Sequence, residues 1–216
     1  MIDKINAKYI VIEGNIGSGK TSLAQMLSQY YNCKLVLEEF AENSFLPKFY
    51  EQPERWAFPL EMSFLADRFH QMKKMFNQSD VENFQIVSDY LFDKSMIFAS
   101  NTLNGNEWQL YESFFTIINQ SMPKPDIILY LSNSIEGLQQ NIKKRGRNYE
   151  QNIAPEYLEK IESGYRQFIS NHPELNIIVI PSNELDFVNN PVDFTNIRIA
   201  LEKAIVDNQK TLFPHI

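Results

Sequence analysis

The sequence predicts a single α/β domain in which helices flank an open sheet of parallel strands. Three observations lead to this fold class. Short apolar runs alternate with longer segments whose apolar residues recur at helical spacing. The runs are nearly continuous, as expected for parallel strands that are buried on both faces. The chain has 216 residues, of which 44% are hydrophobic and 22% charged, and this suits one domain with a substantial core.

Five runs are expected to form the strands. Each is rich in aliphatic and β-branched residues, which favour strands. In chain order they are YIVIE (9–13), KLVLE (34–38), FQIVS (84–88), DIILYL (126–131) and NIIVI (176–180). Because helical patterns connect them, right-handed crossovers are expected to make the sheet parallel.

The clearest helical patterns lie in the connecting segments 21–31, 58–76 and 155–169. In the first of these, Leu23, Leu27 and Tyr30 fall on one face. No internal repeat, low-complexity tract or flexible linker divides the chain. We therefore expect one domain over residues 1–216.

The composition disfavours several classes of function. The net charge of −7 has the wrong sign for binding a nucleic-acid polymer. No run approaches the roughly 18 apolar residues of a membrane span. The single cysteine, Cys33, excludes an intrachain disulfide and is consistent with a reducing compartment. Because the N-terminus shows no signal-peptide pattern, a cytoplasmic location is expected.

A phosphate-binding loop (P-loop) is the most specific feature of the sequence. Residues 14–21, GNIGSGKT, fit the pattern G-x-x-x-x-G-K-[ST] between a predicted strand and a predicted helix, as the motif requires. The glycines let backbone N–H groups point at phosphate oxygens, and the helix start adds its positive dipole end. Lys20 could reach the β- and γ-phosphates, and the Thr21 hydroxyl could bind Mg²⁺. The predicted nucleotide-binding residues are Gly14, Asn15, Ile16, Gly17, Ser18, Gly19, Lys20 and Thr21.

Acidic residues follow two of the predicted strands. Glu38 ends the second strand, with Glu39 beside it, and Asp89 ends the third. Ligands of open parallel sheets bind beyond the carboxyl ends of the strands. A glutamate there could accept a proton from an attacking hydroxyl, and Asp89 could hold Mg²⁺ through water. A solvated loop acid is the alternative interpretation.

The segment KKRGRNYEQNI, residues 143–153, places four cations within five positions and then Glu150. On an acidic chain this is a local anion-binding patch. Arg145 and Arg147 could neutralise charge on a phosphoryl group during transfer. A solvated basic face is the alternative, but the P-loop favours the functional interpretation.

The chain resembles the deoxynucleoside kinases, which are P-loop enzymes that phosphorylate the 5′-hydroxyl of a deoxynucleoside. The resemblance rests on YIVIEGNIGSGKTSL, LEEFAENSFLPKFYEQPERWAFPLEMSFLADRF and RGRNYEQNIAPEYLEKI. It implies the P-loop kinase fold, with a five-stranded parallel sheet flanked by helices and a short arginine-containing lid at 143–153. It also implies ATP or another nucleoside triphosphate as phosphate donor, Mg²⁺ as cofactor, and a homodimer.

The resemblance also implies roles on the side of the acceptor. Glu38, rather than Glu39, matches the general base of the family. Tyr50 and Glu150 match a pair that binds the 3′-hydroxyl of the sugar. Arg68 matches an arginine near the nucleobase.

On the donor side, Arg145 and Arg147 match arginines of the lid that close over the triphosphate. Asp186 and Phe187 fall in the loop that would line the adenine of the donor. The family tends to carry an earlier lid arginine where this chain has Asn141.

Glu61 departs from the family, which usually places glutamine at this position beside the nucleobase. An amide can donate and accept hydrogen bonds, whereas an ionised carboxylate only accepts. Glu61 would then favour bases that offer N–H groups, as adenine, guanine and cytosine do. It could instead pair with a cation.

A second departure follows the third strand. The family typically carries an acid, an arginine and a serine there, and a further acid beside the base. A gapless count gives Ser88, Asp89 and Tyr90, then Lys94, so the arginine is missing. A shift of one residue would let Asp89 replace the acid. We hypothesise that Lys94 contacts the substrate and forms a swapped charge pair with Glu61 across the pocket.

The function that follows is Mg²⁺- and ATP-dependent phosphorylation of a deoxynucleoside, with a preference for purines. One alternative is a nucleoside monophosphate kinase, but the acidic segment after Glu38 offers only Lys48 to hold the phosphate of such an acceptor. The other alternative is a nucleotide-binding regulatory protein with weak or no catalysis, which the missing arginine suggests.

Overall fold

A computed structural model describes residues 6–39, 43–76 and 85–207 of the chain. These residues form one sheet of five parallel strands in the order β2-β3-β1-β4-β5. The strands are β1 (Tyr9–Gly14), β2 (Lys34–Val36), β3 (Ile86–Ser88), β4 (Ile127–Ser132) and β5 (Ile177–Pro181). The prediction of five parallel strands is confirmed.

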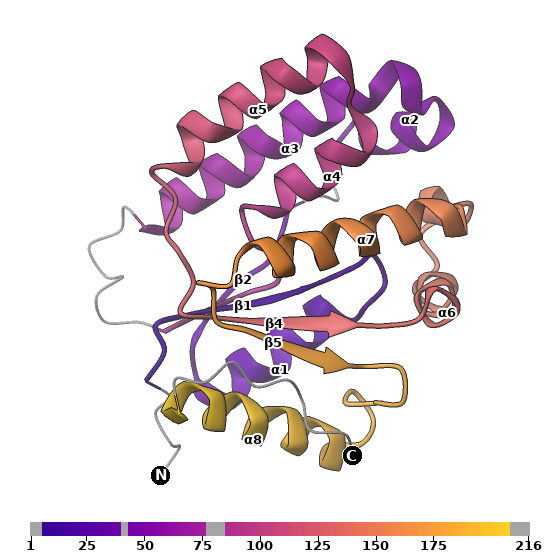
Figure 1. The fold of residues 1–216 in the computed structure, drawn as a ribbon. Coiled ribbons are helices and arrows are strands. Elements are labelled where there is room, and N and C mark those ends of the chain that lie inside the picture. Colours follow the sequence, from indigo (N-terminus) through magenta and orange to yellow (C-terminus); the bar gives the residue numbers. More distant parts are fainter. Residues whose placement is uncertain (1–5, 40–42, 77–84, 208–216) are drawn as a thin grey trace.

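Helices cover both faces of the sheet (Figure 1). The helices α1 (Lys20–Tyr31) and α8 (Pro191–Asp207) lie on one face. The opposite face carries α2 (Leu46–Glu51), α3 (Pro53–Phe76), α4 (Lys94–Thr102), α5 (Gly105–Asn119) and α7 (Pro155–Asn171). The remaining helix, α6 (Ile135–Arg145), lies beyond the carboxyl end of β4, and the 3-10 turn η2 (Asn148–Glu150) follows it.

Alternate residues of the strands enter two separate cores. Tyr9 and Val11 of β1 pack with α3, α4 and α5. Ile10 and Ile12 of the same strand pack with α1 and α8. Because both faces of the sheet are buried, each strand needs apolar side chains on consecutive positions, and this accounts for the continuous runs in the sequence.

The topology sets the position of the ligand site. From the central strand β1 the chain crosses beyond β3 to form the edge strand β2, and from β3 it crosses back to β4 on the other side of β1. The direction of winding therefore reverses beside β1. In open parallel sheets, ligands bind at this reversal, outside the carboxyl ends of the strands. The P-loop, Glu38 and Asp89 all lie at this edge.

The second and third strands are shorter than predicted. The second ends at Val36 instead of Glu38, and β3 begins at Ile86. The two strands pair over only three residues. The N–H of Asp89 makes the last backbone bond between them, to the carbonyl of Val36 at 3.1 Å, and the N–H of Glu38 then donates to the side chain of Asp89 instead of a backbone carbonyl. Glu38 consequently lies in the loop beyond the strand. Residue 84, the predicted first residue of this strand, lies outside the described residues.

Two expectations drawn from composition concern Cys33 and membranes. Cys33 is half-buried and unpaired, and burial raises the pKa of its thiol to about 11. Within the described ranges, no helix has the length and apolar character needed to cross a membrane.

Candidate active site

The P-loop joins β1 to α1, and its backbone requires glycine at two positions. Gly17 and Gly19 have φ angles of 83° and 95°, in the left-handed region that favours glycine. A Cβ atom on Gly17 would lie 2.8 Å from the carbonyl oxygen of Leu138, and one on Gly19 would lie 3.0 Å from the ring of Phe187. The loop therefore packs closely against α6 and against the segment after β5.

Two asparagines hold this loop in place. The buried Asn15 donates from Nδ2 to the carbonyl of Leu158 in α7 at 2.8 Å, and its Oδ1 accepts from the N–H of Ile16. Asn141 of α6 donates to the carbonyl of Gly17 at 2.9 Å. The side chain of Asn15, which the sequence placed among the nucleotide-binding residues, thus supports the shape of the loop.

Lys20 lies in the mouth of the P-loop. Its Nζ donates to the carbonyls of Gly14 and Asn15, at 2.8 Å each. Burial lowers the pKa of Lys20 to about 8, and the nearby charge of Lys94 acts in the same direction. A desolvated ammonium group is a strong site for an anion, because it has lost most of its water.

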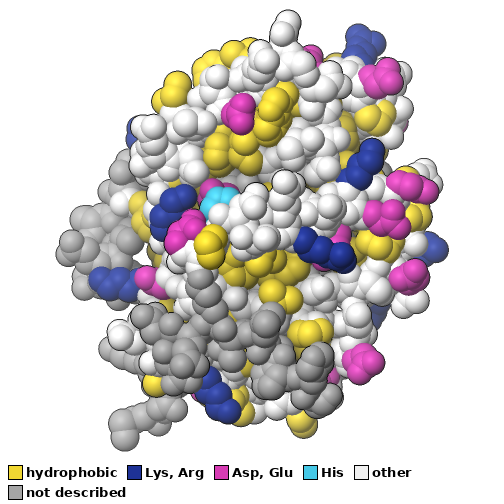
Figure 2. All heavy atoms as spheres, viewed as in Figure 1, with side chains coloured by type: hydrophobic (Ala, Val, Ile, Leu, Met, Phe, Trp, Pro, Cys, Tyr) yellow, Lys and Arg dark blue, Asp and Glu magenta, His cyan; other side chains and the backbone are white. Residues whose placement is uncertain are grey.

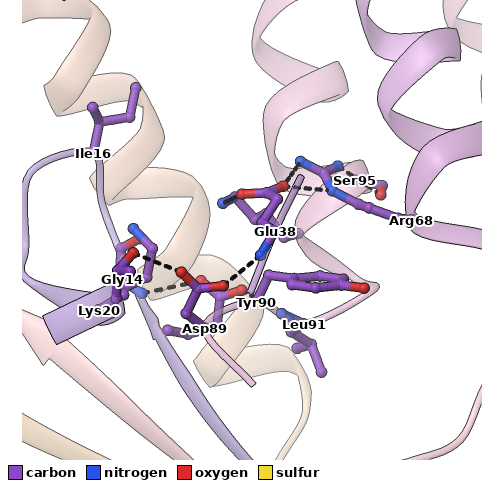
Figure 3. Close-up of polar contacts among 12 residues, drawn as sticks. Gly14, Ile16, Lys20, Glu38, Arg68, Asp89, Tyr90, Leu91 and Ser95 are labelled. Carbon is purple, nitrogen blue, oxygen red and sulfur yellow. Dashed lines mark hydrogen bonds and ion pairs between the residues drawn. The ribbon is translucent and has the colours of Figure 1, made fainter. Parts of the chain in front are cut away.

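Asp89 connects the P-loop helix to the loop after β2 (Figure 3). Its Oδ2 accepts from the hydroxyl of Thr21 at 2.6 Å, and its Oδ1 accepts from the N–H of Glu38 at 2.7 Å. The oxygens of Thr21 and Asp89 are the type of donor that Mg²⁺ prefers, so these residues fit such an ion. The described residues contain no cluster of three or more His, Cys, Asp or Glu that could hold a metal. Phosphate and water would have to supply the remaining ligands.

Glu38 is held between two cations. Its Oε1 accepts from Nε and Nη2 of Arg68 at 2.8 and 2.6 Å, and its Oε2 accepts from Nζ of Lys94 at 2.7 Å. The side chains of Arg68, Lys94 and Glu38 are only 4%, 7% and 10% exposed. Burial alone would raise the pKa of Glu38, but the two cations outweigh it and lower this pKa to about 2. The group is therefore an ionised, strongly bound carboxylate.

The structure does not support the hypothesis of a swapped pair between Lys94 and Glu61. Lys94 begins α4 and points at Glu38, and the described residues show no ion pair to Glu61. Arg68, expected near the nucleobase, also binds Glu38, while its Nη1 donates to the hydroxyl of Ser95 at 2.8 Å (Figure 3). The reason is geometric, because the packing of α3 against α4 directs both cations to the end of β2.

Glu61 lies two turns before Arg68 on the same face of α3 and is only 2% exposed. Its Oε1 accepts from the hydroxyl of Thr102 at 3.0 Å, and its Oε2 has no hydrogen-bond partner among the described residues. Burial raises the pKa of Glu61 to about 7, although Arg68 opposes the shift.

The predicted sugar-binding and lid residues lie together. Glu150 in η2 is buried and accepts from Arg147 at 3.2 Å and from Arg145. The ring of Tyr50 stacks on that of Tyr149 with their centroids 6.2 Å apart. One carboxylate therefore holds both lid arginines beside Tyr50.

Two cavities collect the predicted residues. The first brings together Ile16, Gly17, Lys20, Thr21, Glu38, Tyr50, Glu61, Arg68, Asp89, Lys94, Arg145, Arg147 and Glu150. The second is lined by Gly17, Ser18, Gly19, Lys20, Thr21, Arg145, Arg147, Asp186 and Phe187. Because Lys20, Thr21 and the two arginines line both, the cavities meet at the P-loop. This arrangement can hold two ligands with a transferable phosphoryl group between them.

Sequence reasoning missed several residues of the site. The buried Glu13 accepts from the N–H groups of Gly14 and Leu91 and from the hydroxyl of Tyr165, at 2.6 to 3.0 Å. An acid at the end of an apolar run, directly before the P-loop, was an available signal for it. Ser95 and Thr102 carry no such signal, because their importance depends on how α4 packs against α3.

Comparisons with known proteins agree with this geometry. A model of the deoxynucleoside kinase family matches residues 10–206. The chain is 35% identical over 204 residues to a deoxyguanosine kinase of Bacillus subtilis, which covers 93% of this chain and 99% of that protein. It is 30% identical over 205 residues to a deoxyadenosine/deoxycytidine kinase of the same organism, covering 93% and 94% of the two chains.

Solved structures show the same fold. A deoxyadenosine kinase from M. mycoides with bound dATP superposes with a TM-score of 0.77 and 25% identity, covering 89% of this chain and 98% of that one. The same kinase with dCMP and a flexible dCDP also gives a TM-score of 0.77, at 24% identity.

The ion pairs of Glu38 predict a pH-dependent stability. The pKa of Glu38 is lowered from 4.5 to about 2 on folding, so its contribution is present above about pH 5 and is lost as the pH falls towards 2. We expect the difference in free energy of unfolding between the wild type and Glu38→Gln to shrink by about 3 kcal/mol over this range. Urea unfolding at several pH values measures it. Glu39→Gln, at the exposed neighbour, is the control, and a difference that stays constant with pH would contradict the assignment.

Proposed function

The chain belongs to the deoxynucleoside kinase family, and on that premise we propose that it transfers the γ-phosphoryl group of ATP or another nucleoside triphosphate to the 5′-hydroxyl of a deoxynucleoside. One observation carries the proposal. The buried carboxylate of Glu38 lines the first cavity beside Lys20, at the junction with the second cavity. A base beside the junction of two ligand cavities is what transfer between them needs.

Glu38 serves as the general base in this reaction. The 5′-hydroxyl oxygen forms a bond to the γ-phosphorus as the bond to the β-phosphate oxygen breaks, and the hydroxyl proton passes to Glu38. A carboxylate with a lowered pKa is a weak base, so it takes the proton late, when bonding to phosphorus has made the hydroxyl acidic.

Lys94 compensates for the missing arginine after β3. Its ammonium group lies 2.7 Å from Glu38 and is buried, so it supplies a cation beside the base from the start of α4. There it orients Glu38 and adds positive charge close to the attacking oxygen. The charge of Lys94 helps to lower the pKa of Lys20, and this supports its placement near the phosphates.

The second cavity would take the phosphate donor. Its P-loop would cradle the phosphates, and Asp186 and Phe187 line the same cavity, where they would contact the base of the donor. Thr21, and Asp89 through water, would hold Mg²⁺, which adds positive charge to the β- and γ-phosphates. Residues 1–216 act as one domain in this proposal, and residues 143–153 act as the lid that brings Arg145 and Arg147 over the triphosphate.

The first cavity would take the acceptor, with Tyr50 and Glu150 at the sugar and Glu61 at the nucleobase. The named substrates of the relatives are deoxyguanosine, deoxyadenosine and deoxycytidine, whose bases all bear an amino group. Glu61 offers an acceptor to such a group. We propose a preference for purines within this set.

The alternative functions fit the site less well. A nucleoside monophosphate kinase needs free cations near Glu38, but Arg68 and Lys94 are already paired with it. Lys48, the other candidate, is exposed and lies over the ring of Trp56. A regulatory protein without catalysis would not need a base, a phosphate loop and sugar-binding residues in one continuous site.

A substrate panel tests this function. With ATP and Mg²⁺, we expect the protein to phosphorylate at least one of the four deoxynucleosides and none of their monophosphates. In a Glu38→Gln variant shown to be folded, kcat should fall by about 10²- to 10⁴-fold while ATP still binds, because the amide cannot take the proton and the P-loop is unchanged. Glu39→Gln is the matched control, since its acid lies next to Glu38 in the sequence but lines neither cavity. Phosphorylation of the monophosphates alone would support the alternative kinase.

We also propose that the chain forms a homodimer through α5. Leu110, Phe114 and Ile117 recur at helical spacing and are 49%, 43% and 69% exposed. Hydrophobic side chains gather over the same helical layer in the space-filling view (Figure 2). An apolar stripe on one helix face suits a second copy of the chain.

Sedimentation measures the proposed dimer. Ile117→Glu should convert it into a monomer, because the carboxylate would be buried unpaired at the interface. Val206→Glu on α8, at an 82% exposed position, should leave the mass unchanged. A monomeric wild type, or a dimeric Ile117→Glu variant, would exclude this interface.

A further inference from the structure

The carboxyl group of Glu61 is an incompletely satisfied polar group in the wall of the first cavity. It is 2% exposed, yet its Oε2 has no hydrogen-bond partner among the described residues. A buried polar atom without a partner is costly, and native proteins contain few of them. Because Glu61 lines the cavity, a bound ligand can supply the missing partner.

The groups around Glu61 do not fix it in one protonation state. Two cations lower its pKa, Arg68 on the same helix and Lys94 on α4, and both are ion-paired with Glu38. The negative charge of Glu38 also acts on Glu61 and raises its pKa. The other titratable groups that face it are the neutral phenols of Tyr50, Tyr111 and Tyr157, from α2, α5 and α7. No described cation makes a direct ion pair with Glu61, so the site does not require the carboxylate form.

Thr102 can hydrogen-bond to either form of Glu61. Its hydroxyl lies 3.0 Å from Oε1 of Glu61 and 3.2 Å from the carbonyl oxygen of Phe98. A hydroxyl has one proton and two lone pairs. It can donate to Oε1 when Glu61 is ionised or carries its proton on Oε2, and it can donate to Phe98 when the proton is on Oε1. Neither form leaves Thr102 unsatisfied.

We propose that the proton on Glu61 selects the nucleobase, an inference that rests on the proposed deoxynucleoside kinase activity. As a carboxylate, Glu61 accepts at both oxygens, and the ring N–H and amino group of guanine match it. As a carboxylic acid, it donates from Oε2 and accepts at Oε1, which matches the ring nitrogen and amino group of adenine or cytosine, and also a ring N–H beside a carbonyl oxygen, as in thymine and guanine. The carboxylate therefore selects guanine, whereas the acid admits all four bases.

The aromatic walls and the acidity of Glu61 support this selection. The rings of Phe64 and Phe98 line the same cavity and offer flat apolar surfaces for a base. Burial raises the pKa of Glu61 to about 7, so both forms are populated near neutral pH. A small change of pH then changes which base edge is complementary.

The ratio of kcat/KM for deoxyguanosine to that for deoxyadenosine tests the proposal. This ratio should rise by about 10- to 100-fold between about pH 6 and about pH 8, because deoxyadenosine needs the acid and the ratio of carboxylate to acid rises tenfold per pH unit. Titration of groups common to both reactions, including those that bind the phosphates, cancels in the ratio.

Matched variants assign the effect to Glu61. Glu61→Gln presents a fixed donor and acceptor, so its ratio should not change with pH. Glu54→Gln, at an exposed acid on the same helix, should keep the wild-type pH dependence. Thermal unfolding of each variant verifies that it is folded.

Calorimetry of the wild type gives a second measurement that needs no variant. In buffers of different ionisation enthalpy near pH 7, where Glu61 is about half protonated, binding of deoxyadenosine should take up about half a proton and binding of deoxyguanosine through the carboxylate should release about half of one. A ratio that is constant with pH, or a Glu61→Gln variant that keeps the pH dependence, would overturn the selection while leaving the kinase activity intact. Failure to phosphorylate any deoxynucleoside would overturn both proposals.

Discussion

The site depends on the burial of one carboxylate, that of Glu38, between the cations Arg68 and Lys94. A buried charge is tolerated only when it is paired and hydrogen-bonded, and removing one partner of such a group is strongly destabilising. These contacts therefore fix α3 and α4 relative to the loop after β2. They also fix the position of the atom that we propose as the base.

Asp89 extends this constraint to the phosphate loop. With one oxygen on Thr21 and the other on the backbone of Glu38, it sets the spacing between the P-loop helix and the base. Glu13 performs a similar task on the other side of β3, where it joins the first P-loop glycine to the segment that follows Asp89. Two buried acids thus hold the ends of these strands in register, as a phosphoryl transfer at this edge of the sheet would require.

The sequence was sufficient for the features that are encoded locally. The five strands and the P-loop follow from runs of apolar residues and from one motif, because each depends on consecutive positions. The partner of Lys94 could not be predicted in this way, since it depends on how α4 packs against α3. The end of β2 was misplaced by two residues for a related reason, because the side chain of Asp89, beyond the neighbouring strand, accepts the N–H of Glu38 in place of a backbone carbonyl. Glu61 was identified as a departure from the family, but its buried and unpartnered oxygen is visible only in three dimensions.

The central claim is that a cation at position 94 orients Glu38 in place of the missing arginine. The most direct test compares kcat for Lys94→Arg and Lys94→Met, with both variants shown to be folded. We predict that Lys94→Met lowers kcat by about 10²- to 10³-fold with little change in KM for ATP, and that Lys94→Arg recovers most of this loss. Equal kcat values for the wild type and Lys94→Met would contradict the claim, as would equal losses in the two variants.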